Sequence, residues 1–357
     1  MTTRRGFLAS LLVSATIPSL TWADAGGPKY LAAAKEPDGA YALFGLSATG
    51  QDTFRIPLPA RGHAGTGHPL RPEAVVFARR PGTYALVIDC AAGQLIRELA
   101  APAGFHFSGH GTFSADGDLL YTGEIDSLSG EGQIGVWVRS GGYVRQGAFA
   151  SGGVGPHEIL LLPGQDILVV ANGGIIVAPD DERTKLNLET MQPNLSYLSR
   201  TGEILDQVTL PSALHQNSIR HLAVSQVGRV AFAMQWEGDI TDVPPLLGLH
   251  HIGQPAQLAE MPEYLAVRSK GYAGSVAFSG DGNNVAITCP KGDVLIVYDN
   301  DGRFDAQLTR SDICGIAKAP DGMIATDGMG GVAAMRNNSL LPLAAVNRAW
   351  DNHLFSL

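Results

Sequence analysis

A short segment centred on an Asp-Gly turn occurs twice in this chain, as FSADGDLLYT at residues 113–122 and as FSGDGNNVAIT at 278–288. Each copy is an apolar strand, a tight turn and a second apolar strand, which is the pattern of a β-hairpin. Looser copies recur every ~35–60 residues, and a repeat of that length predicts a stack of similar supersecondary units. The repeat therefore constrains the fold before any other motif is considered.

Six such hairpins can be aligned on their turns, at residues 72–87, 110–123, 157–170, 221–233, 274–288 and 314–326. A degenerate seventh begins at Lys29, and the 44 glycines and 21 prolines suit a chain with this many turns. We predict an all-β fold, a seven-bladed β-propeller spanning 26–357, with a strand in 346–357 that closes the ring. Two sandwich domains are the alternative, although no linker-like stretch interrupts the repeats.

The N-terminus carries paired arginines, Arg4 and Arg5, followed by an apolar run to Trp22 and small residues up to Ala25. This order is typical of a twin-arginine export signal, so we expect residues 1–25 to be a signal peptide and the rest of the chain to be periplasmic. Cleavage is expected after Ala25, or alternatively after Ala23. An ordinary signal or a short membrane anchor is the competing interpretation. Because this route carries folded proteins, some with cofactors, it favours a metal or redox group.

Charge and cysteine content exclude several functions. The formal net charge of −9 argues against nucleic acid and anionic lipid as partners. After the signal, no run reaches the ~18 apolar residues of a membrane span. The three cysteines, Cys90, Cys289 and Cys314, cannot all pair, and no CxxC or CxxCH motif supports thioredoxin chemistry or covalent haem. The sequence also lacks a Gly-x-Ser-x-Gly elbow, a P-loop and an HExxH motif.

Alignment of the hairpins on their turns places histidines at one position of three consecutive blades. His110 and His221 coincide, and His157, or its neighbour Glu158, takes that position in the blade between them. The position begins the innermost strand, at the rim of the central channel. Converging neutral imidazoles are typical metal ligands. We therefore predict a transition-metal site, for iron or copper, formed by His110, His157 and His221. The alternative is that these histidines hydrogen-bond carbonyl groups and join the blades.

Three long loops, 124–132, 173–194 and 236–245, follow the second strands of the same blades. They are expected on the face where the inner strands begin, enclosing a pocket over the histidines. The candidate residues of this pocket, or of a second layer around the metal, are Glu73, His106, Glu124, Glu158, Arg183, Lys185, Arg220, Trp236 and Glu237.

The other histidines receive weaker assignments. His63 and His68 lie in a Gly-rich segment at the entry to the second blade, where we expect rim hydrogen bonds. His250 and His251 are expected at the surface of an outer strand. His353 lies in the closing strand and is assigned no role.

Five segments carry a resemblance to a known family: 109–117, 155–158, 185–191, 218–223 and 326–331. Through them the chain resembles the bacterial domain-of-unknown-function family numbered 1513, whose members are similar to YVTN and quinoprotein amine dehydrogenase β-propellers. The resemblance covers nearly all of the chain after the signal. It implies export by the twin-arginine route and a setting of iron acquisition, beside imelysin-type and di-haem oxidoreductase-type periplasmic proteins. Periplasmic iron-uptake proteins are therefore the partners that the resemblance implies.

Three functions remain open on the sequence. The first is a periplasmic metal-binding propeller that serves iron uptake or handling. The second is a non-catalytic scaffold that presents its loop-rich face to a partner. The third is an enzyme, either a lactonase-like hydrolase or an oxidoreductase subunit. The histidines favour the first, because propeller lactonases commonly hold their metal with carboxylate and amide groups.

Overall fold

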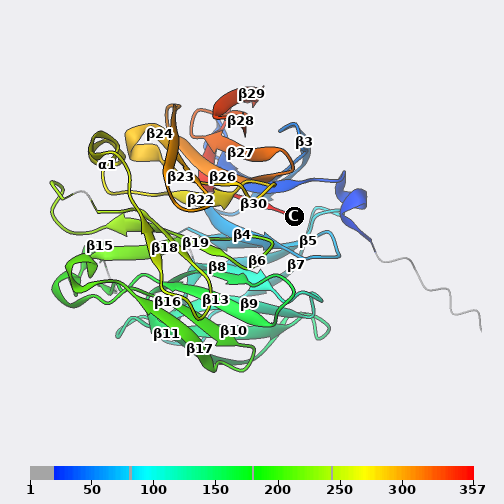
Figure 1. Cartoon of the computed structure of the whole chain (residues 1–357). Coiled ribbons are helices and arrows are strands. Elements are labelled where there is room, and N and C mark those ends of the chain that lie inside the picture. The colour runs from blue at the N-terminus through cyan, green and yellow to red at the C-terminus, as the bar shows by residue number, and fades with distance from the viewer. Residues whose placement is uncertain (1–19, 80–82, 179–180, 243) are drawn as a thin grey trace, which may run out of the picture.

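The computed structural model describes residues 20–79, 83–178, 181–242 and 244–357, apart from the side chains of Glu182 and Arg183. Its strands form seven four-stranded antiparallel sheets that follow one another around a ring. The predicted seven-bladed β-propeller is therefore confirmed (Figure 1). The blue strands of the first blade lie beside the orange and red strands of the last (Figure 1).

Each of the first four blades has four strands, ordered from the channel outward. Blade 1 consists of β30 (Ala349–Ser356), β1 (Tyr30–Lys35), β2 (Tyr41–Leu46) and β3 (Asp52–Leu58). Blade 2 consists of β4 (Gly62–Gly67), β5 (Glu73–Ala78), β6 (Ala85–Asp89) and β7 (Gln94–Leu99). Blade 3 consists of β8 (Phe105–Phe113), β9 (Leu119–Asp126), β10 (Glu131–Val138) and β11 (Val144–Val154). Blade 4 consists of β12 (Pro156–Leu161), β13 (Ile167–Asn172), β16 (Asn194–Ser199) and β17 (Ile204–Thr209).

The last three blades repeat the same order. Blade 5 consists of β18 (Asn217–Val224), β19 (Val230–Trp236), β20 (Leu247–His250) and β21 (Gln257–Ala259). Blade 6 consists of β22 (Ser275–Phe278), β23 (Asn284–Cys289), β24 (Val294–Asp299) and β25 (Phe304–Thr309). Blade 7 consists of β26 (Ile313–Ala319), β27 (Gly322–Asp327), β28 (Gly331–Arg336) and β29 (Ser339–Ala345).

Little helix interrupts this pattern. Among the described residues the single α-helix is α1 (Glu263–Ser269), between blades 5 and 6. Short 3-10 turns occur at Trp22–Ala25, Leu188–Thr190, Ser212–Leu214 and Pro290–Gly292. No helix in the described parts of the chain is long and apolar enough to cross a membrane.

The two ends of the described chain meet in blade 1. The C-terminal strand β30 pairs antiparallel with β1, with Ala32 opposite Leu354 and Ala34 opposite Trp350. The strand expected in the C-terminal segment is therefore present, and it forms the innermost position of the blade. Because this strand closes the ring, it joins the first and last parts of the sequence without leaving a free sheet edge at the channel.

Seven apolar clusters fill the spaces between neighbouring blades, one at each interface. Between blades 5 and 6, for example, Leu247 packs in the same cluster as Ile296, and both are fully buried. Burial of one such side chain contributes about 1.5–3 kcal/mol. The core is therefore distributed around the ring rather than concentrated at one point, and it leaves the channel for polar residues.

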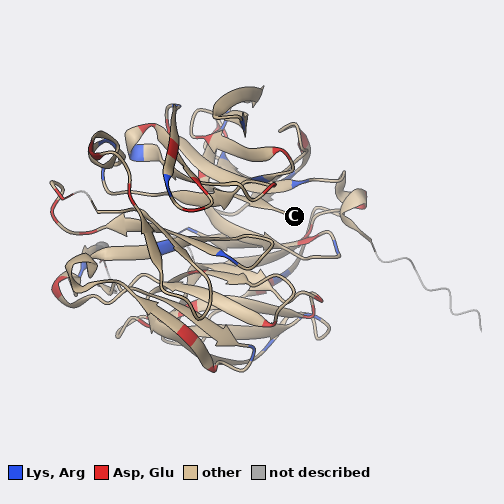
Figure 2. Cartoon of the chain, viewed as in Figure 1, with Lys and Arg blue, Asp and Glu red and all other residues tan. Residues whose placement is uncertain are grey.

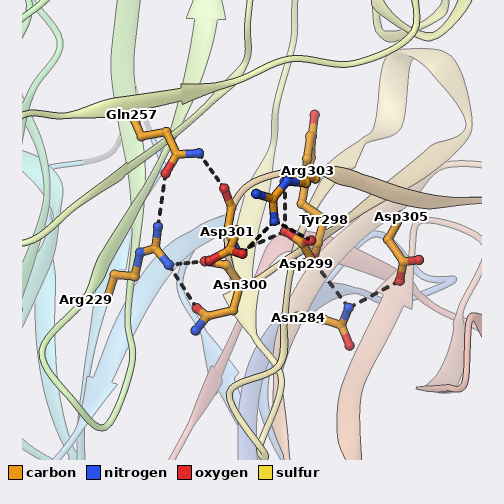
Figure 3. Close-up of polar contacts among 9 residues, drawn as sticks. All are labelled: Arg229, Gln257, Asn284, Tyr298, Asp299, Asn300, Asp301, Arg303 and Asp305. Atoms are coloured by element: carbon orange, nitrogen blue, oxygen red, sulfur yellow. Dashed lines mark hydrogen bonds and ion pairs between the residues drawn. The ribbon is translucent and has the colours of Figure 1, made fainter.

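Polar contacts at the turns orient neighbouring blades. Arg229, in the turn between β18 and β19, donates to the carbonyl oxygen of Asn300 and to Oε1 of Gln257 at 3.3 Å (Figure 3). Gln257 in turn donates to the carbonyl oxygen of Asp301. Exposed contacts of this kind contribute only about 0–1 kcal/mol, so they fix the turns more than they stabilise the ring. Figure 2 shows acidic and basic residues interspersed around the molecule.

Two details of the predicted hairpins are wrong. The hairpin at 72–87 is formed by the second and third strands of blade 2, because the innermost strand is β4, whose Gly-rich sequence hides its strand pattern. The loop expected at 124–132 is mostly strand, since β9 and β10 continue to Asp126 and from Glu131. The segment 173–194 does leave the blade, and it carries a two-stranded hairpin of β14 (Val177–Ala178) and β15 (Asp181–Lys185).

Candidate metal centre

The innermost strands of five consecutive blades each contribute one histidine to a common cluster, and β8 carries a second histidine, His106, outside it. From blade 1 to blade 5 the cluster residues are His353, His63, His110, His157 and His221. In each of these strands the pairing with the second strand shifts register at the histidine or beside it. Such β-bulges bend a strand and re-aim its side chains. Blade 6 offers the comparison, because Ser275 begins its inner strand and that strand pairs without a shift.

The five imidazoles form one compact cluster. The centroids of eight ring pairs lie between 4.5 and 6.0 Å apart. Two groups of three are close enough to share an ion: in His110, His157 and His221, and in His63, His110 and His353, the candidate ligand nitrogens all lie within 4.8 Å of one another. His110 belongs to both groups. The first group contains the three histidines that the sequence predicts as ligands.

Each ring has a buried nitrogen that makes no hydrogen bond to the described structure. These atoms are Nδ1 of His63, His157 and His221, and Nε2 of His110 and His353. Buried polar atoms are nearly always paired, so each exception requires a water, an ion or another explanation. Five exceptions within one cluster indicate a common cause.

Two other histidines of the same protein show how a structural histidine is accommodated. Nδ1 of the buried His250 lies 2.7 Å from Oη of Tyr197, and its Nε2 lies 2.6 Å from the carbonyl oxygen of Gln254. Nδ1 of His68 accepts the backbone N–H groups of Leu70 and Arg71, at 3.0 and 3.1 Å. Both side chains are satisfied by the protein itself. The inner-strand cluster differs from them in this respect.

Burial keeps the cluster histidines neutral. Desolvation, followed by the positive charges of Arg220 and Arg79, lowers the pKa of His221 to about 3. Desolvation, followed by the neighbouring His221, lowers the pKa of His353 to about 4. The same cause holds the pKa of the other three cluster histidines well below the ordinary value. A neutral imidazole is the form that binds a metal.

One carboxylate reaches the cluster. Oε2 of Glu158 lies 3.5 Å from Nδ1 of His221, and Oε1 lies 3.9 Å from Nδ1 of His110. The backbone N–H of Leu222 donates to Oε2 at 2.8 Å. Burial raises the pKa of Glu158 to about 7. Glu158 therefore lies beside two imidazoles, facing Nδ1 of His110 and the unpaired Nδ1 of His221.

The cluster divides the channel into two cavities. A cavity of about 250 Å³ lies on the side of the loops and contacts His63 and His157. A second cavity, of about 370 Å³, lies on the other side and contacts His110 and Glu158. His221 and His353 line both cavities. The histidines therefore lie within the channel, not at its rim as the sequence predicts, because the bulges occur inside the inner strands.

Several other predicted residues lie at or near this site. Lys185 and Arg220 line the loop-side cavity. Glu237 does not line it, but pairs with Lys185. The side chain of Arg183 lies outside the described residues. The segment 173–194 therefore contributes to the wall through Ile175, Val177 and Lys185, whereas no described residue of 236–245 lines the cavity.

Glu73 and Glu124 belong to ion pairs away from the cluster. Glu73 accepts from Arg139 and from Oη of Tyr143 at 2.5 Å, linking blades 2 and 3. Glu124 is fully buried and accepts from Arg145, at 2.7 Å. The expectation that they line the pocket is wrong, since these partners hold both carboxylates elsewhere.

Two more predicted residues take local roles. Nδ1 of His106 lies 3.1 Å from Oγ of Ser127, and the indole N–H of Trp236 donates to the carbonyl oxygen of Asp239 at 2.8 Å. Neither residue lines the loop-side cavity. They orient the connections in which they occur.

The sequence missed two members of the cluster, His63 and His353. The expectation that His63 makes rim hydrogen bonds is wrong, since its Nδ1 has no partner among the described residues. The strand order explains why both were missed. The inner strand of blade 2 precedes the hairpin that the sequence reveals, and the inner strand of blade 1 comes from the C-terminus.

His250 is buried, not exposed as expected. The cysteines are buried and unpaired, and burial raises the pKa of each thiol to about 12.

Fold and channel together define the class: a seven-bladed β-propeller with a histidine cluster across its channel. The chain belongs to the family described as protein of unknown function (DUF1513), which matches residues 56–357. The family expected from the sequence is thereby confirmed. No curated protein matches the sequence significantly.

Among solved structures, the fold is similar to that of hydrazine synthase from Kuenenia stuttgartiensis. The identity is 13%, the match covers 96% of this chain and 100% of that chain, and the TM-score is 0.59. A protein of unknown function from Bacteroides caccae matches 79% of this chain and 94% of its own, with 12% identity and a TM-score of 0.48. At 13% identity the similarity to hydrazine synthase shows the fold alone.

Proposed function

We propose that this protein is a periplasmic metal-binding propeller that serves iron uptake or handling. His110, His157 and His221 hold the ion, and Glu158 orients His110. Two observations carry the proposal: one nitrogen from each of the three imidazoles lies within 4.8 Å of the others, and each ring has a buried nitrogen without a hydrogen-bond partner. Periplasmic location and iron-uptake partners are inferred from the N-terminal sequence and from the family resemblance.

The separation of the nitrogens fits a bound ion with little rearrangement. Two ligands about 2.1 Å from one ion lie at most about 4.2 Å apart. The candidate atoms of His110, His157 and His221 lie within 4.8 Å of one another. Small rotations of the rings therefore suffice to bring them onto one ion. The candidate nitrogens of the second group, His63, His110 and His353, also lie within 4.8 Å of one another. The cluster therefore offers a second possible ion position that shares His110.

The donor set restricts the class of metal. Imidazole nitrogens suit iron, copper, zinc and nickel, whereas calcium and magnesium prefer oxygen ligands. Oε1 of Glu158 faces Nδ1 of His110 and leaves the unpaired Nε2 of that ring for the ion. A carboxylate in this position fixes ring orientation and raises ligand basicity. Because burial keeps the histidines neutral, metal binding near pH 7 does not require them to lose a proton.

Calorimetric titration of the metal-free chain with Fe²⁺ under anaerobic conditions tests the proposal, with Cu²⁺, Zn²⁺ and Ca²⁺ as comparisons. We expect Fe²⁺ to bind stoichiometrically and Ca²⁺ not to bind. His157→Ala should lower the affinity by at least about 100-fold, since loss of second-layer partners alone costs 10–100-fold. The exposed His251 gives the matched control, and His251→Ala should bind as the parent does.

Circular dichroism on each variant separates a lost ligand from a lost fold. Absence of any transition-metal binding by the folded parent would overturn the proposal. Equal affinity of His157→Ala and the parent would overturn the assigned ligands. Tighter binding of Cu²⁺ alone is expected from the general affinity order, so the metal content of protein isolated from the periplasm decides for or against iron.

A further inference from the structure

The cavity on the loop side of the histidine cluster is lined by positive charge. Arg79, which follows β5, Arg220 of β18 and Lys185 of β15 line it from three different blades. Among the described residues, no aspartate or glutamate lines this cavity. Lys185 pairs with Glu237, and Arg79 lies 3.5 Å from Asp351; neither carboxylate lines the cavity. The charged side chains that line the cavity among the described residues are therefore all cations.

These cations lie close enough to influence the histidines. After burial, the positive charges of Arg220 and Arg79 are what further lower the pKa of His221, and Arg79 also acts on His63. A divalent ion on the same imidazoles experiences the same repulsion. The imidazoles contribute no negative charge against it, because they bind as neutral groups. Metal and cations become compatible when an anion lies between them.

We propose, resting on the proposed function, that the loop-side cavity binds a small dianionic oxyanion, a dicarboxylate or phosphate, which acts as a co-ligand of the histidine-bound metal. Guanidinium groups match carboxylate and phosphate oxygens in pairs, and an ammonium group adds a point charge. The anion bridges the ion on the histidines and the cations of the wall.

Size and polar lining suit such a ligand. The cavity measures about 250 Å³, below the roughly 300–1,000 Å³ of pockets for drug-sized molecules. Gln235, Tyr272 and Asn352 add neutral polar groups to the wall. Nδ2 of Asn352 lies 3.5 Å from Oη of Tyr272, so these two groups are adjacent. A molecule of a few heavy atoms with several oxygens fits this lining.

The cavity on the other side of the cluster has a different chemistry. It is lined by Glu158, by Lys318 and by many apolar or backbone groups of the inner strands. It therefore offers no concentration of positive charge. The asymmetry assigns the anion to the loop side and leaves the carboxylate of Glu158 on the opposite side of the metal.

The test titrates Co²⁺, a spectroscopically visible probe, into the metal-free full chain with malonate, with phosphate, or with neither. Malonamide, a neutral analogue of malonate, is the matched control. We expect malonate or phosphate to raise the Co²⁺ affinity at least tenfold and to change the visible Co²⁺ spectrum, whereas malonamide does neither. By reciprocity, Co²⁺ should raise the malonate affinity by the same factor. The anion that gives the larger gain in Co²⁺ affinity shows whether the cavity prefers a carboxylate or a phosphate.

Substitution of a cation that lines the cavity should raise the Co²⁺ affinity without an anion and reduce the gain from malonate. Loss of the fold would not produce this combination. In buffer without either anion, Arg79→Gln should bind Co²⁺ more tightly than the parent, because one repulsive charge is gone. With malonate, the same variant should show a smaller gain than the parent. Lys185→Gln, on the hairpin outside the ring, should also reduce the gain if Arg79→Gln does not fold. Arg229→Gln, in the β18–β19 turn, serves as control and should behave as the parent.

The outcomes separate this inference from the proposed function. Co²⁺ binding that is unaffected by malonate and phosphate overturns the anion site and leaves the metal site standing. Malonate binding that is equally tight with and without Co²⁺ overturns the co-ligand role. Failure of every transition metal to bind overturns the proposed function itself.

Discussion

His110 and His157 come from the innermost strands of adjacent blades, and their ring centroids lie 4.6 Å apart. Neither Nε2 of His110 nor Nδ1 of His157 has a hydrogen-bond partner among the described residues. The hydrophobic interfaces of the ring bring these two polar rings together in a buried place. The arrangement is costly for a protein without a ligand, and that cost has consequences that can be measured.

Acid should destabilise the metal-free protein between pH 6.5 and about 4. Burial lowers the pKa of His221 to about 3 and of His353 to about 4. A histidine with a lowered pKa contributes stability that is complete above the unfolded value and is lost as the pH falls towards the folded value. Each such group contributes up to about 1.4 kcal/mol per pH unit.

Urea unfolding at several pH values measures this slope. His221→Asn should flatten it, and His215→Asn, outside the cluster, should not. Stability that does not change across this range would show that the histidines are not held neutral by the fold.

Glu158→Gln should have opposite effects on stability and binding. Burial raises the pKa of Glu158 to about 7, so its stabilising contribution is present below the unfolded pKa and is lost as the pH rises through 7. At pH 8 the metal-free Gln variant should therefore be more stable than the parent by about 1–3 kcal/mol. Its metal affinity should fall about 10–100-fold, as for other second-layer partners. A variant that loses both stability and affinity contradicts this role.

Glu73→Gln should lower stability and leave metal binding unchanged. Glu73 pairs with Arg139 and accepts from Tyr143, and none of the three lines the loop-side cavity. Removal of one partner of a largely buried pair leaves the other charge unsatisfied, at a cost of about 2–3 kcal/mol. Denaturant unfolding and Co²⁺ titration of the same sample check both parts. A change in Co²⁺ affinity would show instead that Glu73 contributes to the metal site.

The proposed twin-arginine signal predicts a phenotype of its own. Substitution of both Arg4 and Arg5 by Lys should keep the protein in the cytoplasm, because the twin-arginine pathway recognises the arginine pair. Cell fractionation followed by immunoblotting measures this directly. Periplasmic accumulation of the double variant at the parent level would favour an ordinary signal. Residues 4 and 5 lie outside the described residues.

The repeat was sufficient to predict the propeller and three members of the cluster. Apolar strands and Asp-Gly turns are local signals, so the hairpins ending at β9, β13 and β19 could be aligned and their histidines compared. The same alignment could not identify His63, because β4 is Gly-rich and lacks an apolar strand pattern. It could not identify His353, because membership of blade 1 depends on pairing between the two ends of the chain.

The surrounding residues were harder to predict than the ligands. Glu124 was expected in a loop, but strands β9 and β10 extend far enough to bury it beside Arg145. Arg79 was not singled out at all, although it lines the cavity and influences His221. Its position depends on how blade 2 packs against its neighbours, which a single sequence does not encode locally. The β-bulges that aim the histidines have no sequence signal of their own in this chain.

X-ray absorption at the metal edge of the loaded protein tests whether the inner-strand histidines bind the metal. We expect at least three imidazole nitrogens at about 2.0–2.1 Å from the metal. This imidazole scattering should be lost in the His110→Ala variant, since His110 belongs to both groups of three. A shell made only of oxygen atoms, or an imidazole signal that is unchanged in His110→Ala, would contradict the assignment of the metal to the inner-strand histidines.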